Sequence, residues 1–228
     1  HSTSRRQRQM CIRDRCIVVG ILLGSIYYCK FCEINNRRDI YRNIFGKYSE
    51  VKGGHVKSHT IYFCQEGNKV MGMSELVLTN ESSQPLIHPL LYLNPGLEVT
   101  VLTEEQEGNL PYVREEQVIL LERTLQPGEE IVLHVEYEGR IDEAICFLEF
   151  TDEEFHDTRL ASFFRTNHLM FRHGGNVVRV GDDYTLLFPE CLWYPVCVPP
   201  VNVDKPLARQ YDFTHYLLKV GKIGKRVA

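Results

Sequence analysis

The feature that most limits what this chain can fold into is a series of short apolar or alternating segments between residues 55 and 220. In Ile131 to Tyr137, apolar residues occupy every second position, which is the period of a strand with one buried face. Turn residues at 66–68, 126–129 and 181–183 separate the segments. About ten such strands with no long helical pattern between them predict a mainly β fold, an antiparallel β-sandwich.

The expected strands are 56–64, 69–80, 86–93, 97–102, 118–125, 131–137, 144–150, 169–171, 176–180, 184–188 and 213–220. The first two are separated by Glu66-Gly67-Asn68 and read as a hairpin. The sandwich domain is therefore predicted to cover residues 53–220, after the break at Gly53-Gly54.

Composition excludes some classes of function. The net charge of −4 and basic clusters confined to the two ends argue against nucleic acid as a partner. The eight cysteines are scattered, with half of them in the first 32 residues, which favours buried thiols over a disulfide framework. Cys191 and Cys197 are the nearest pair in the globular part.

An uncharged apolar run from Cys16 to Cys29 is typical of a membrane segment. As a helix its 14 residues rise about 21 Å, against a hydrocarbon core of about 30 Å. Residues 1–15 have no periodicity and are interpreted as a non-native leader, which makes 16–33 a truncated transmembrane segment. A signal peptide is the alternative, but Tyr27 and Tyr28 are bulky where a cleavage site needs small residues.

Residues 34–52 are expected to form a juxtamembrane amphipathic helix and a linker, with Ile40, Ile44 and Tyr48 on one face. This face either lies on lipid headgroups or packs on the following domain, and packing is favoured. We expect a cell-membrane protein with an extracytoplasmic β domain, although basic residues flank both ends of the apolar run and weaken the charge rule for orientation. Residues 221–228 form a basic tail.

Several short motifs resemble the N-terminal β domain of the aminopeptidase N family of zinc peptidases. They are an L-x-L-N strand at Leu91–Asn94, a V-x-V strand at Val99–Val101, an L-x-P-G-E turn at Leu125–Glu129 and a V-x-Y-x-G strand end at Val135–Gly139. A more specific block comprises Leu187–Val196 and Tyr211–Val220. It is similar to the membrane-fused bacterial form of this domain, which is associated with ABC-type transporter permeases. The resemblance implies a fragment of a larger polypeptide.

The zinc-binding motif of that family is not present in this sequence. None of the nine histidines is followed by glutamate, so there is no H-E-x-x-H to bind zinc and activate water. The resemblance therefore assigns no catalytic residue, no metal ligand and no cofactor to this chain, and any zinc would belong to a full-length parent.

One binding patch is a candidate: Trp193, Tyr194 and Pro195, which include the only tryptophan. If exposed, this patch suits recognition of a peptide or a sugar. A buried corner that packs on the core is the favoured alternative.

Three further clusters are weaker candidates. Thr151 to Asp157 collects carboxylates and one histidine but matches no known metal spacing. Cys29 and Cys32 have C-x-x-C spacing without a second pair of ligands. Cys191 and His215 as nucleophile and base lack an evident orienting residue.

Three hypotheses for function follow. The first is a non-catalytic, membrane-anchored β domain whose partners are the membrane and the rest of a peptidase-like or permease polypeptide. The second is a fragment of an active zinc aminopeptidase whose catalytic domain lies elsewhere. The third is an extracytoplasmic ligand-binding module.

Overall fold

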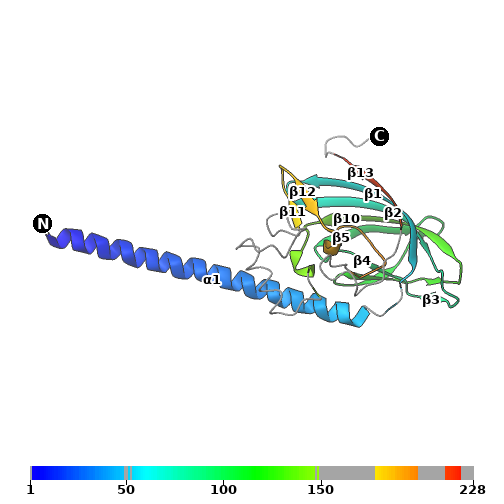
Figure 1. Ribbon diagram of the computed structural model, residues 1–228, viewed down its shortest axis with the longest axis horizontal. Coiled ribbons are helices and arrows are strands. Elements are labelled where there is room, and N and C mark those ends of the chain that lie inside the picture. Colours follow the sequence, from blue (N-terminus) through cyan, green and yellow to red (C-terminus); the bar gives the residue numbers. More distant parts are fainter. Residues whose placement is uncertain are drawn as a thin grey trace, which may run out of the picture. The chain divides into compact units, whose positions relative to one another are not determined.

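The computed structural model describes residues 2–48, 51, 53–146, 148, 178–199 and 214–221, with helix side chains from residue 15 onward. Within these residues the chain forms a long helix followed by short strands (Figure 1). The helix is α1 (Ser2–Tyr48), and two 3-10 helices are η1 (Glu143–Ile145) and η2 (Pro189–Cys191). The strands are β1 (His55–Glu66), β2 (Lys69–Thr79), β3 (Leu86–Ile87), β4 (Leu90–Tyr92), β5 (Leu97–Glu104), β6 (Gly108–Asn109), β7 (Tyr112–Glu115), β8 (Val118–Leu121), β9 (Thr124–Leu125), β10 (Glu130–Gly139), β11 (Val178–Val180), β12 (Thr185–Leu187) and β13 (His215–Val220).

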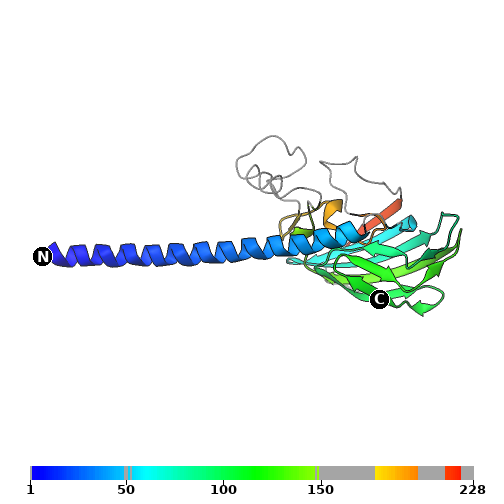
Figure 2. The ribbon, with the colours of Figure 1, turned by 90° about the horizontal axis from the view of Figure 1, so that it is seen from below.

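The helix α1 is continuous, where the sequence predicted a membrane helix and a separate juxtamembrane helix (Figures 1 and 2). No proline occurs before Pro85, so nothing in the covalent chain forces a break. Its segment Arg15–Tyr48 has a mean hydropathy of 1.7 over its most apolar window and is long and apolar enough to cross a membrane. Residues 1–40 and 41–228 form two compact units, and the last two turns of α1 belong to the second.

The β region contains a six-stranded sheet of order β13-β1-β2-β10-β5-β6 and a three-stranded sheet of order β4-β8-β7 (Figure 1). Two further pairs are β3-β9 and β11-β12. Neighbouring strands are antiparallel, except that β13 lies parallel to β1. The predicted mainly β class with an N-terminal helix is confirmed.

The six-stranded and three-stranded sheets share one hydrophobic core, which makes them two layers of a sandwich. Buried core residues come from both sheets: Val56, Phe63, Val70, Leu76, Leu78, Leu97, Leu102, Ile131, Leu133, Val135 and Tyr137 from the first, and Leu91, Ile119 and Leu121 from the second. In β10 every second residue is buried, as its alternation predicted. The hairpin is also confirmed, with β1 and β2 paired from Glu66–Lys69 outward.

Some expected strands differ from the structure. The segment 86–93 is divided because His88 takes a left-handed backbone (φ 52°) between β3 and β4. Where the strand 144–150 was predicted, residues 144 and 145 instead belong to η1, whose first turn is capped by the Asp142 carboxylate accepting from the Ala144 N–H at 3.0 Å. Residues 147, 149 and 150 of that prediction lie outside the described residues. The strand predicted at 169–171 lies outside the described residues.

Tyr137 lies over Gly72 on the inner face of the six-stranded sheet. The two residues are directly opposite in the β2–β10 register. A Cβ atom at position 72 would overlap the Tyr137 ring, so the glycine makes room for the aromatic side chain. Tyr137 is 1% exposed, and its ring fills the space that any larger residue at position 72 would need.

We therefore predict that Gly72→Ala destabilises the domain by about 2 to 3 kcal/mol through overpacking. Gly46→Ala is the matched control, because a Cβ atom there meets nothing within 4 Å and alanine favours the helix. Melting temperatures of the full chain in detergent will compare the two. Equal melting temperatures would contradict the role given to Gly72.

Candidate functional site

The candidate patch lies on a loop that is fixed at both ends. Leu192 takes a left-handed conformation (φ 52°) that ends η2 and turns the chain into Trp193. The Asn94 N–H donates to the Leu192 carbonyl at 2.8 Å. Beyond the patch, Tyr92 and Val196 exchange two backbone hydrogen bonds of 2.7 and 3.0 Å. The loop is thus held against the end of β4.

Asn94 forms the bond network beneath this loop. Its buried side chain donates to the Cys191 carbonyl at 2.7 Å and the Asp142 carbonyl at 3.1 Å. The side-chain oxygen of Asn94, Oδ1, accepts from the backbone N–H groups of Gly96 and Asp142, both at 2.9 Å. One amide therefore joins the segments before η1 and within η2, and all its polar atoms are satisfied.

Trp193 and Tyr194 are partly buried against the core, and Pro195 is buried. The Trp193 ring makes edge contacts with Phe63 at 5.6 Å and with Tyr194 at 4.5 Å between centroids. Only Trp193 and Tyr194 leave some ring surface open, so the three predicted residues lie together but present a small patch. Whether this patch binds a ligand stays a prediction.

The structure adds His59 to this cluster. Its ring lies 5.5 Å from that of Tyr194 and 5.8 Å from that of Tyr216. His59 is 1% exposed, and its Nε2 has no hydrogen-bond partner among the described residues. Burial lowers the pKa of His59 to about 4, because the charged imidazolium would lose its hydration.

Sequence reasoning missed His59 because of a bulge. The register of β1 shifts between Val56 and Ser58, so Val56 and His59 both face the core although they are three positions apart and would point to opposite faces of a regular strand. Strict alternation from Val56 would have placed His59 in solvent. The signal that was available is that His59 is in phase with the apolar residues Ile61 and Phe63.

The thiol of Cys191 does not suit a nucleophile. It is buried and donates to the Phe188 carbonyl at 2.9 Å. Burial raises the pKa of Cys191, so the thiolate that would react is disfavoured. His215, its imagined base, lies on the exposed strand β13. This arrangement gives the thiol a packing role.

Across the part of the chain that the structure describes, no three His, Cys, Asp or Glu side chains are placed to hold a metal ion. The acidic segment Thr151 to Asp157 lies outside those residues.

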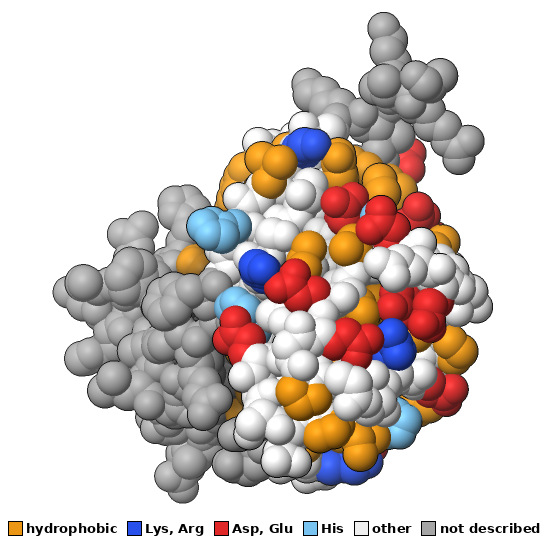
Figure 3. Space-filling view, turned by 90° about the vertical axis from the view of Figure 1, so that its right-hand side faces the viewer, with side chains coloured by type: hydrophobic (Ala, Val, Ile, Leu, Met, Phe, Trp, Pro, Cys, Tyr) orange, Lys and Arg blue, Asp and Glu red, His pale blue; other side chains and the backbone are white. Residues whose placement is uncertain are grey.

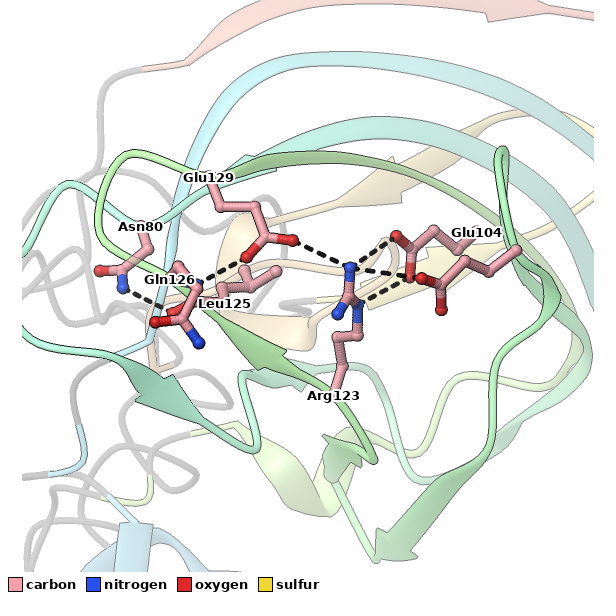
Figure 4. A network of polar contacts seen from close by, with 7 residues as sticks. Asn80, Glu104, Arg123, Leu125, Gln126 and Glu129 are labelled. Atoms are coloured by element: carbon pink, nitrogen blue, oxygen red, sulfur yellow. Dashed lines mark hydrogen bonds and ion pairs between the residues drawn. The ribbon is translucent and has the colours of Figure 1, made fainter.

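A cluster of carboxylates surrounds Arg123, whose guanidinium forms ion pairs with Glu104, Glu107 and Glu129 (Figure 4). Arg123 bonds to Glu104 at 3.2 Å and to Glu129 at 2.9 Å. The hydrogen bond that Arg123 donates to the Glu104 carboxylate raises the pKa of Arg123. Glu129 also accepts from the Gln126 N–H at 2.6 Å, which fastens the turn before β10. The L-x-P-G-E motif thus has a structural role in this chain.

Comparison with known proteins gives a partial structural likeness. No protein-family model matches the sequence, and no curated protein does so. Similar solved structures include the M1 zinc metallopeptidase of Deinococcus radiodurans and a mutant of it bound to a Tyr-Ser-Ala substrate. Each shows 21% identity and a TM-score of 0.36 over 40% of this chain and 21% of that chain.

The matched region thus spans about a fifth of the length of those enzymes. The likeness concerns the fold alone. The enzymes are zinc metallopeptidases, the class to which the family named from the sequence motifs belongs. A fusion to a transporter permease stays a prediction.

We predict that His59 makes the domain less stable in acid. Its folded pKa of about 4 lies below the ordinary value of 6.5, so between these pH values the unfolded chain binds a proton that the folded chain does not. The free energy of unfolding should therefore fall by up to about 3 kcal/mol as the pH drops from 6.5 toward 4.

His59→Phe should remove this part of the pH dependence, because phenylalanine keeps the ring contacts and cannot be protonated. His134→Phe is the control, since His134 is partly exposed opposite Glu75. Melting temperatures between neutral and acidic pH test the difference. Identical pH profiles for wild type and His59→Phe would refute the assignment.

Trp193→Ala is expected to destabilise the domain by about 2 kcal/mol, less than the cost for a fully buried tryptophan. The physical reason is the loss of its contacts with Phe63 and Tyr194. Val113→Ala, an exposed position on β7, serves as the control and should change the melting temperature little. An unchanged melting temperature with lost binding on a glycan or peptide array would instead support a ligand-binding patch.

Proposed function

We propose that this chain is a non-catalytic β domain tethered to a membrane by α1, and that it works as part of a larger peptidase-like or permease polypeptide. The observation that carries the proposal is the exposed apolar surface of α1. Ile17, Val18, Val19, Ile21, Leu22, Leu23, Ile26, Tyr27 and Tyr28 are all more than half exposed. A surface of this kind is stable in hydrocarbon and unfavourable in water.

The attachment of the helix end to the β domain supports a role as a tether. Tyr41 lies seven residues before the end of α1, and its hydroxyl donates to the Asp142 carboxylate at 2.8 Å. Its carbonyl accepts from the buried Gln117 side chain at 2.8 Å. Tyr41 is 5% exposed, so the contact is a packed one.

The last turn is held in the same way. Tyr48 donates to Glu115 at 2.6 Å, and Lys47 forms an ion pair with the same carboxylate at 2.7 Å. The Tyr48 carbonyl, which has no partner within the helix, accepts from the Tyr92 hydroxyl at 3.1 Å. The helix thus ends in direct contact with the sandwich, and on its predicted apolar face Tyr48 is buried while Ile40 is exposed.

The non-catalytic part of the proposal rests on chemistry. The sequence has no H-E-x-x-H, and Cys191 is held as a buried thiol. If the natural gene continues into H-E-x-x-H, the chain is instead a fragment of an active zinc aminopeptidase. Sequencing the genomic flanks distinguishes these two alternatives.

The tether is tested by placing lysines in the apolar surface of α1. Leu22→Lys with Leu23→Lys should release the chain from membranes, because each lysine costs about 3 kcal/mol in the bilayer centre. Membranes from expressing cells are washed in alkaline carbonate, and the chain is followed in pellet and supernatant. The control is Val101→Lys with Val113→Lys, two exposed positions in the β domain, which should stay in the pellet with the wild type.

A wild-type chain that is extracted by carbonate would rule out the tether. Equal retention of the Leu22→Lys, Leu23→Lys variant would do the same.

A further inference from the structure

Among the described strands, β13 forms one edge of the six-stranded sheet. It stands at one end of the sheet order, next to β1, and no described strand pairs with its outer side (Figure 1). Tyr216, Leu217, Leu218 and Val220 are each 50% to 71% exposed. Figure 3 shows hydrophobic side chains along the upper rim of the domain, the level at which β13 runs in Figure 1. Edges that stay single usually carry charges, prolines or bulges, and here Lys219 is the only charge.

The register divides these side chains between the two faces. Tyr216, Leu218 and Val220 lie opposite His59, Ile61 and Phe63, which all face the core. The inner face of the sheet therefore extends past β1 as a row of half-exposed apolar side chains. Tyr216 joins this row to the aromatic cluster, since its ring lies 5.8 Å from that of Tyr194.

The backbone determines which groups are available at the open side. The Gly221 N–H donates to the Phe63 carbonyl at 2.9 Å, so the backbone groups of residue 221 face β1. The N–H and C=O groups of successive residues point to opposite sides of a strand. Those of residues 216, 218 and 220 therefore face away from β1. The three residues with apolar side chains on the inner face thus also carry the N–H and C=O groups with which no described strand pairs.

We propose that β13 pairs antiparallel with β13 of a second copy of this chain, about a two-fold axis at Leu218. In this pairing, inner-face residues must lie opposite inner-face residues of the second copy, because a shift of one residue would place the inner face of one copy on the outer side of the other. In this register Leu218 lies opposite Leu218, and Tyr216 lies opposite Val220 of the second copy. In the Leu218–Leu218 pair and in the Tyr216–Val220 pairs, the N–H and C=O groups that face away from β1 bond to each other across the two copies.

The charges fit this arrangement. Lys219 falls opposite Leu217 of the second copy, which keeps the two lysines from facing each other across the axis. Lys219 is also bound within its own domain, donating to the Tyr62 hydroxyl at 2.8 Å and lying 4.5 Å from the Tyr62 ring centroid. An isologous contact of this kind is closed and leaves no further edge at β13.

One strand pair is a small interface, below the roughly 1,200 Å² of a stable complex between free proteins. Confinement to one membrane raises the effective concentration of the two copies and offsets this deficit. That last step alone rests on the proposed tether; the pairing itself does not.

The test is a charge exchange at the axis, in the full chain, with two differently tagged copies. Leu218→Lys alone and Leu218→Glu alone should each weaken dimerisation by about tenfold or more, because like charges then face each other. Mixed together, the two variants should recover a heterodimer. Native mass spectrometry from detergent and from lipid nanodiscs counts the chains in each complex, and unchanged melting temperatures show that both variants fold.

A dimer in nanodiscs, lost in each variant and restored in the mixture, is the expected result, with a weaker dimer or monomers in detergent, where the copies are not confined to one membrane. The proposal is overturned if the wild type is monomeric in nanodiscs, or if Leu218→Lys alone stays dimeric there. It is equally overturned if a different polypeptide occupies the edge. Carbonate extraction of the same chain separates failure of the tether from failure of the pairing.

Discussion

The structure depends on the burial of one face of the six-stranded sheet against the three-stranded sheet. Strand β10 shows the constraint most clearly, because its buried residues alternate with more exposed ones along its length. Tyr137 extends this buried row over Gly72, where the absence of a side chain leaves room for the ring. Burial of this row places β2 and β5 on either side of β10. The loop that carries Trp193 and Tyr194 is held separately, by backbone hydrogen bonds at the end of β4.

Hydrogen bonds from polar side chains hold the turns and the helix end in place around the core. Asn94 joins the segments around η1 and η2, and Arg123 joins β5 to the turn before β10. The end of α1 is attached in the same manner, through tyrosine hydroxyls and backbone carbonyls. Buried polar groups of this kind are costly when unpaired, so their pairing makes each attachment specific.

The aromatic cluster and the open edge are two parts of one region. His59, Tyr194 and Tyr216 are in contact through their rings, and Tyr216 begins the exposed strand β13. Among the described residues, the buried His59 ring has a nitrogen without a hydrogen-bond partner and β13 carries a row of exposed apolar side chains, and both features are unusual in a folded domain. A second copy at this edge would complete the inner face of the sheet. It would also cover the side of Tyr216 that water now reaches.

The sequence alone determined the class of fold, the hairpin of β1 and β2, the alternation of β10 and the apolar helix, because these follow from local periodicity and turn residues. It also placed Trp193, Tyr194 and Pro195 next to one another, which covalent neighbours must be. Only the tertiary structure decided that Pro195 is buried, that a bulge turns His59 inward, and that β13 lies parallel to β1. These outcomes depend on contacts between residues more than a hundred positions apart, such as His59 with Tyr194 and Tyr216, and no local pattern encodes a contact at that separation.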